Sequence, residues 1–177
     1  MSEYKFMCIS KFKGITIPIY LGDLDGCFAI TKASKKAFDC GDGVMSKYQM
    51  IIDIKLFKED NEFIKYIFHH ELGHVDIFLK YLNNEFDFTP SGTFKEELYC
   101  DMYSLKAIGR YDKEFIDYLR GYEKSTELQR MINKYIVKFI DKGIFENIDN
   151  ILKVNFECVE DAIYAQELID SYLDDMI

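Results

Sequence analysis

The spacing of hydrophobic positions changes along the chain, and the first regular pattern is an alternation. In residues 48–57, YQMIIDIKLF, apolar and polar side chains alternate over most of the stretch. A period of two is typical of a β-strand with one buried face. Residues 3–12 and 14–22 are further strand candidates, and turns are expected at residues 22–26 and 39–44. The apolar face of the alternating strand would consist of Met50, Ile52, Ile54 and Leu56, and its polar face of Gln49, Asp53 and Lys55.

From residue 60 onward the spacing becomes helical, with apolar residues recurring three and four positions apart. A first helix is expected over residues 60–82, with Asp60 or Asn61 as its N-cap. A second is expected from about residue 94 to residue 108, where Gly109 would end it. Further helices are expected over residues 112–122, over residues 126–143 after a capping box of Thr126 and Gln129, and within residues 144–176.

Strands come first and helices follow, with no repeat, low-complexity tract or linker between them. This order predicts an α+β fold, in which a small antiparallel or mixed sheet precedes a helical half. The length of 177 residues suits one compact domain. We therefore expect a single domain over residues 1–177, with residues 1–59 mostly in strands, residues 60–109 in two helices and residues 110–177 in C-terminal helices.

The charge balance narrows the classes of partner. The formal net charge is −9, which disfavours binding to nucleic acid or to an anionic membrane, since both need basic surface. The five cysteines are scattered, and no pair has the spacing of a zinc ribbon or a thioredoxin motif. With no evident signal peptide, the cysteines indicate reduced thiols. We expect a cytoplasmic protein, in a microbial cell or in a host cell if the source is viral.

All three histidines of the chain lie within six positions of the first predicted helix: His69, His70 and His74. His70 and His74 are four residues apart, so they point the same way with about 6 Å of rise between them. Two imidazoles placed in this way can bind one metal ion. Glu71 follows His70 directly, and its carboxylate could reach a water molecule on that metal. The spacing H-E-x-x-H is the signature of zinc hydrolases, in which the glutamate is the general base.

The third histidine fits this metal less well. His69 points about 100° away from His70 on a helix, so a packed or solvent-facing side chain is the simpler interpretation. A surface helix that carries two histidines and a glutamate by chance is the alternative to the metal site as a whole. The scarcity of histidine elsewhere in the chain favours the metal site.

A catalytic zinc ion needs a third protein ligand, and no histidine remains to supply it. In the metzincin pattern a glycine and a histidine would stand at Ile77 and Lys80, so that class is excluded. The next helix offers carboxylates and a thiol instead. Glu96 fits a capping box with Thr93, which leaves Glu97 free. Cys100, one turn further on, could in principle bind zinc, but a buried core cysteine is the more common role.

Asp101 lies four residues after Glu97, so the two carboxylates share a helix face. One of them can bind zinc while the other accepts the second N–H of a ligand histidine, which fixes the orientation of the ring. Together, His70-Glu71-x-x-His74 and Glu97-x-x-x-Asp101 resemble the gluzincin, or thermolysin-like, metallopeptidases. The short chain also looks like the small intracellular members of the ImmA/IrrE-like group. The resemblance implies zinc ligands at His70, His74 and Glu97, a general base at Glu71 and a supporting aspartate at Asp101.

The resemblance covers about residues 48–109, and it implies more than the ligands. It implies a minimal zincin-like fold in which residues 60–109 carry the metal site and residues 50–56 form the sheet edge beside the active-site helix. An extended protein or peptide substrate would pair antiparallel with that edge. Larger gluzincins stabilise the oxyanion with a further histidine that this chain lacks, so a tyrosine, an arginine or a backbone amide would serve.

The expected function is therefore a zinc-dependent endopeptidase with a narrow intracellular protein substrate. A second hypothesis is a non-catalytic regulatory or interaction protein that binds zinc for structure or sensing. A third is a zinc hydrolase of non-peptide substrates, which the second motif disfavours because this arrangement belongs mostly to peptidases.

Overall fold

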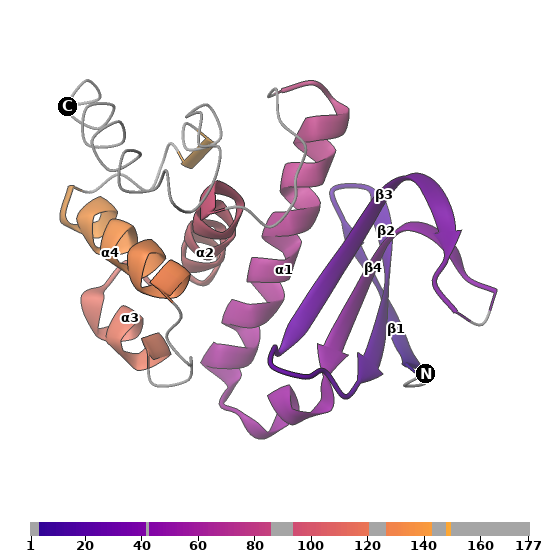
Figure 1. Cartoon of the computed structure of the whole chain (residues 1–177), viewed down its shortest axis with the longest axis horizontal. Coiled ribbons are helices and arrows are strands. Elements are labelled where there is room, and N and C mark those ends of the chain that lie inside the picture. The colour runs from indigo at the N-terminus through magenta and orange to yellow at the C-terminus, as the bar shows by residue number, and fades with distance from the viewer. Residues whose placement is uncertain (1–3, 42, 86–93, 121–126, 143–147, 150–177) are drawn as a thin grey trace. The chain divides into compact units, whose positions relative to one another are not determined.

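The computed structural model describes residues 4–41, 43–85, 94–120, 127–142 and 148–149. A sheet precedes the helices, so the predicted α+β class is confirmed (Figure 1). The chain divides into two compact units, Met1–Glu85 and Phe86–Ile177, which are described in turn. Within the described residues, no helix combines the length and the apolar character that crossing a membrane requires.

The first unit contains a four-stranded mixed sheet in the order β1-β2-β4-β3. Its strands are β1 (Lys5–Phe12), β2 (Ile15–Gly22), β3 (Ala29–Asp39) and β4 (Met45–Asp53). The β1–β2 and β3–β4 pairs are antiparallel, whereas β2 and β4 run parallel. The strands at the two edges of the sheet are therefore β1 and β3, and β4 lies inside it.

This order corrects the prediction for residues 50–56. They do not form an edge strand, because β4 is paired on both sides and ends at Asp53. Asp53 then caps a short 3₁₀ helix, η1 (Ile54–Lys58). The structure has a strand, β3, that we did not predict; its sequence AITKASKKAFD mixes lysines with small side chains, as a half-exposed edge strand does.

The predicted polar face of this strand is also wrong for two of its three members. Gln49 and Asp53 are only 4% and 1% exposed. The Gln49 side-chain amide donates to the backbone oxygen of Cys40 at 2.6 Å. Asp53 accepts from the backbone nitrogens of Leu24 at 2.8 Å and of Lys55 at 2.6 Å. Both polar groups are therefore buried because neighbouring loops satisfy them, which a periodicity of two cannot reveal.

One helix, α1 (Asn61–Leu82), packs against β3 in the first unit (Figure 1). The predicted start is confirmed, since the Asp60 side chain accepts from the backbone nitrogens of Glu62 and Phe63. Two ring contacts attach the helix to the sheet side of the unit, at centroid distances of 5.1 Å and 5.9 Å; they pair Phe28 with Phe63 and Tyr48 with Phe78. The helix is therefore attached to the sheet toward both of its ends.

The opposite face of the sheet carries its own small cluster. Tyr20, Leu24, Cys40 and Ile51 are buried there, and Tyr4, Phe38 and Val44 pack against them. Because this face also excludes water, the inner strands are apolar on both sides, as Ile51 and Ile52 show.

The second unit contains α2 (Phe94–Ile108), α3 (Lys113–Arg120) and α4 (Glu127–Lys142). Gly109 follows α2 with a φ of 72°, as the predicted stop requires. Asp112 caps α3 by accepting from the Phe115 nitrogen at 2.8 Å. The rings of Phe94 and Tyr135, 5.5 Å apart, connect α2 to α4. The predicted capping residues Thr93 and Thr126, and most of the helices predicted after residue 143, lie outside the described residues.

Candidate metal centre

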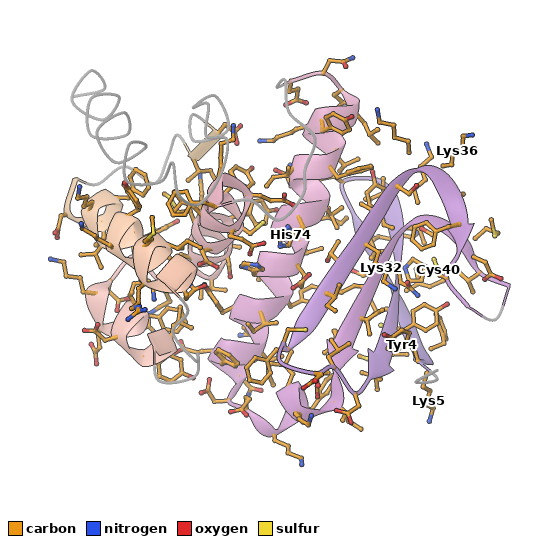
Figure 2. All side chains as sticks on the ribbon, in the orientation of Figure 1. Tyr4, Lys5, Lys32, Lys36, Cys40 and His74 are labelled. Carbon is orange, nitrogen blue, oxygen red and sulfur yellow. The ribbon has the colours of Figure 1, made fainter. Side chains whose placement is uncertain are left out.

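His70 and His74 lie one turn apart in the middle of α1, where Figure 2 labels His74. Their ring centroids are 5.1 Å apart, at an interplanar angle of 71°. Both side chains are half-buried. Two imidazoles this close on one helix face can contribute two ligands to one metal ion.

Glu71, between them in sequence, is 6% exposed. Its Oε2 atom is buried and has no hydrogen-bond partner among the described residues. Leaving a buried carboxylate oxygen without a donor costs about 1–3 kcal/mol or more, so such atoms are uncommon outside functional sites. A zinc-bound water is a donor of the kind that this oxygen lacks, so Glu71 fits the role of general base beside a bound metal.

The charge of the Glu71 carboxylate acts on Cys27, which is distant in the sequence. Cys27 is an exposed thiol in the loop between β2 and β3. Partial burial raises its pKa, and the negative charges of Glu71, Asp53 and Asp25 raise it further. The Glu71 carboxylate is therefore near enough to this loop for its charge to act on the Cys27 thiol. No local sequence pattern could have predicted this proximity, because Cys27 and Glu71 are far apart along the chain.

The backbone of Glu71 is hydrogen-bonded to the sheet. Thr31 on β3 donates its hydroxyl hydrogen to the backbone oxygen of Glu71 at 3.2 Å. This bond places the general-base candidate beside the β3 edge of the sheet, and not beside β4 as the sequence had suggested.

His69 has a different environment, as its direction on the helix predicts. Burial lowers its pKa, and the nearby Lys65 lowers it further, so the ring is neutral at pH 7. Its ring contacts Phe68 edge to face, at a centroid distance of 6.0 Å. His69 is therefore a packed, neutral histidine.

The predicted residues of the second unit lie on α2. Glu97 is partly exposed, whereas Glu96 and Asp101 are 5% and 2% exposed. Asp101 accepts from the Gln129 side-chain amide on α4 at 3.1 Å. That amide also lies 3.4 Å from the Asn133 side-chain oxygen, so Asp101 belongs to a buried polar network between α2 and α4.

Two further residues of α2 stand out. Lys95 is 4% exposed, and burial lowers its pKa to about 8. Cys100 is fully buried. With His70 and His74, the Cys100 thiol makes a set of three ligands that could hold a metal ion. The sequence favoured Glu97 as the third ligand, and Cys100 is the alternative that this set supports.

Comparisons with protein-family models, curated proteins and solved structures give no match. The likeness to gluzincins therefore rests on two short motifs, residues 70–74 on α1 and residues 97–101 on α2.

Proposed function

We propose that this protein is a zinc-dependent endopeptidase of the gluzincin type, which acts on a protein or peptide substrate in the cytoplasm. The observation that carries the proposal is the Glu71 carboxylate, which is buried with one oxygen unpartnered among the described residues and lies between two half-buried histidines. A purely structural helix has no need of such an oxygen, and a general base does.

His70 and His74 are the first two ligands of the proposed site, and α2 supplies the third. When bound, zinc would lower the pKa of a water molecule toward neutrality and polarise the substrate carbonyl. Glu71 would take the proton of the attacking water through Oε2 and later pass it to the leaving amine. Asp101, buried on α2, would accept the second N–H of a ligand histidine and hold the orientation of the ring.

The resemblance to gluzincins favours Glu97 as the third ligand. The group of side chains that could hold a metal ion contains Cys100 instead. The two differ in chemistry: a carboxylate leaves more positive charge on zinc, whereas a thiolate donates more electron density to it. Cobalt substitution distinguishes them, because a bound thiolate gives a strong near-ultraviolet charge-transfer band. The carboxylate model predicts no such band in wild type and weaker metal binding in Glu97→Ala. The thiolate model predicts a band that Cys100→Ser abolishes.

Elemental analysis of the purified protein gives the ligand set directly. We expect about one zinc per chain in wild type and in Glu96→Ala, which serves as the control because Glu96 is the neighbouring carboxylate. We expect little zinc in His70→Ala and His74→Ala. Asp101→Asn should bind zinc about 10–100-fold more weakly, as changes in residues that orient metal ligands do. Zinc content that is unchanged in both histidine variants would contradict the proposed site.

The substrate would pair with β3, because β3 is the sheet edge to which the backbone of Glu71 is tied. An extended peptide adds to an exposed edge through main-chain hydrogen bonds. Digestion of a peptide library, followed by mass spectrometry, tests for this activity, with Glu71→Gln as the inactive control.

A second candidate function is a non-catalytic zinc protein, which a fully buried Cys100 ligand would favour, since thiolates are common in structural zinc sites. This alternative predicts that Glu71→Gln keeps the biological activity of the protein. The endopeptidase predicts that the activity is lost while zinc stays bound.

A further inference from the structure

The outer edge of β3, which pairs with no strand among the described residues, is short and lies beside Glu71. Its regular pairing with β4 runs from Ala29 to Ala33, after which the register shifts before Phe38. Such an irregularity ends the stretch that another strand can join. Thr31, whose hydroxyl binds the backbone of Glu71, lies in the middle of this regular part. An added peptide would therefore occupy about five residues of edge, next to the proposed general base.

The segment that enters this edge contains Asp23 and Asp25, and Lys55 pairs with Asp23 at 2.7 Å. Asp53 holds the loop at both ends, because its side chain accepts from the Leu24 nitrogen and its backbone nitrogen donates to the Phe28 oxygen, each at 2.8 Å. Asp25 lies in this loop, exposed, and forms no ion pair among the described residues. Its charge reaches Cys27, as do those of Glu71 and Asp53.

The other end of the edge is basic. Lys32, Lys35 and Lys36 are exposed on β3, and Figure 2 labels Lys32 and Lys36. The ammonium of Lys32 lies over the Tyr4 ring at 5.7 Å, and that of Lys35 lies over the Tyr81 ring at 4.7 Å. Tyr81 belongs to α1, so Lys35 projects toward the side of the sheet that carries the helix. The potential along this edge therefore changes from negative at Asp25 to positive at Lys35 and Lys36.

We propose that this charge gradient selects the substrate of the endopeptidase: an extended segment that is acidic on the N-terminal side of the cleaved bond and basic on its C-terminal side. Antiparallel pairing with residues 29–33 would direct the N-terminal end of the peptide toward Lys35 and Lys36, and its C-terminal end toward Asp25. Antiparallel pairs are the more stable kind, and β3 already pairs in this way with β4. The inference rests on the proposed function, and it names Asp25, Lys35 and Lys36 as the residues that determine specificity.

Lysines on an edge strand also protect it from aggregation, and an exposed aspartate in a loop needs no partner. The order of the charges separates these explanations from substrate selection. Two fluorogenic peptides with the same composition and the same central residues are compared, one with acidic residues before and basic residues after the centre, and one with the order reversed. Zinc-loaded protein should cleave the first with a kcat/KM about tenfold higher, as two or three exposed ion pairs would give.

Charge reversal on the protein provides the second arm. Asp25→Lys, and Lys35→Glu with Lys36→Glu, should each remove most of this preference. Two controls should retain it: Lys11→Glu, which reverses an exposed lysine on the other edge strand β1, and Asp117→Lys, which reverses an exposed acid on α3. Equal cleavage of both peptides, or a preference for the reversed order, would overturn the proposal and leave the endopeptidase intact.

If zinc-loaded wild type cleaves neither peptide, binding tests the charge gradient separately from the activity. Fluorescence anisotropy with the Glu71→Gln variant measures the affinity of each peptide without turnover. Tighter binding of the acidic-to-basic peptide would support selection by the charge gradient, and digestion of the peptide library would decide separately whether the protein is a peptidase. Equal binding of the two peptides, or no binding of either, would overturn the proposal that the charge gradient selects the substrate.

Discussion

Two buried carboxylates in the first unit differ in how completely their oxygens are hydrogen-bonded. Asp53, at the end of β4, is 1% exposed, and each of its oxygens accepts a backbone N–H, from Leu24 and from Lys55. Glu71, in the middle of α1, is 6% exposed and keeps Oε2 without a partner among the described residues. The fold satisfies the first completely and leaves the second with an open acceptor. The contrast separates a carboxylate that holds loops together from one placed for chemistry.

The largest expected effect is on activity, and it belongs to Glu71. Glu71→Gln should lower kcat by about 10³-fold, within the range that a general base contributes, with zinc still bound. Its free energy of unfolding should stay within about 1 kcal/mol of wild type, because no hydrogen bond to Oε2 is lost. Steady-state kinetics and chemical denaturation measure the two. A Glu71→Gln variant that keeps full activity would show that Glu71 is not the general base.

Asp53 should show the opposite behaviour. Asp53→Ala removes the cap of η1 and the bond to Leu24, so we expect a loss of about 2–3 kcal/mol in the free energy of unfolding. Asp23→Ala is the matched control, since Asp23 also pairs with Lys55, at 2.7 Å, but from an exposed position. It should cost less than about 1 kcal/mol. Equal losses from the two variants would mean that burial of Asp53 does not matter.

The smallest expected effect is on the reactivity of Cys27, whose thiol is influenced by the charge of Glu71. Burial and the charge of Glu71 raise the pKa of Cys27, so less of its thiol is ionised at a given pH below that pKa. Glu71→Gln should therefore lower this pKa and speed alkylation of Cys27 a few-fold in metal-free protein. Asp25→Asn should do the same to a smaller extent, since its effect on Cys27 is weaker. The rate is measured against pH by mass spectrometry of the labelled peptide.

Unchanged alkylation in Glu71→Gln would show that the charge of Glu71 does not act on Cys27. A larger effect from Asp25→Asn than from Glu71→Gln would contradict the expected order of the two charges.

The contrast between Asp53 and Glu71 also shows what the sequence could predict. The start of α1, its length and the one-turn spacing of His70 and His74 follow from local rules of capping and helix geometry, and the structure has them. The fate of Asp53 depends on a loop that lies about 30 residues earlier in the chain, which no local pattern reports. Periodicity therefore placed Asp53 on a solvated face, and the structure buries it.

The same limit applies to β3 and to the third ligand. β3 was missed because an edge strand carries polar and small residues that alternate poorly. Glu97 and Cys100 are one turn apart on α2, so spacing alone leaves both eligible to bind the metal. The structure distinguishes the two residues by their burial, which spacing cannot predict: Cys100 is fully buried and Glu97 is partly exposed.

The central claim is that Glu71 acts on a water molecule beside a zinc ion held by His70 and His74. The most direct measurement is digestion of an unbiased peptide library by wild type and by Glu71→Gln, each with its zinc content determined on the same sample. We predict about one zinc per chain in both proteins and cleavage by wild type alone. A zinc-loaded wild type that cleaves nothing, or a Glu71→Gln variant that cleaves as fast, would contradict the claim.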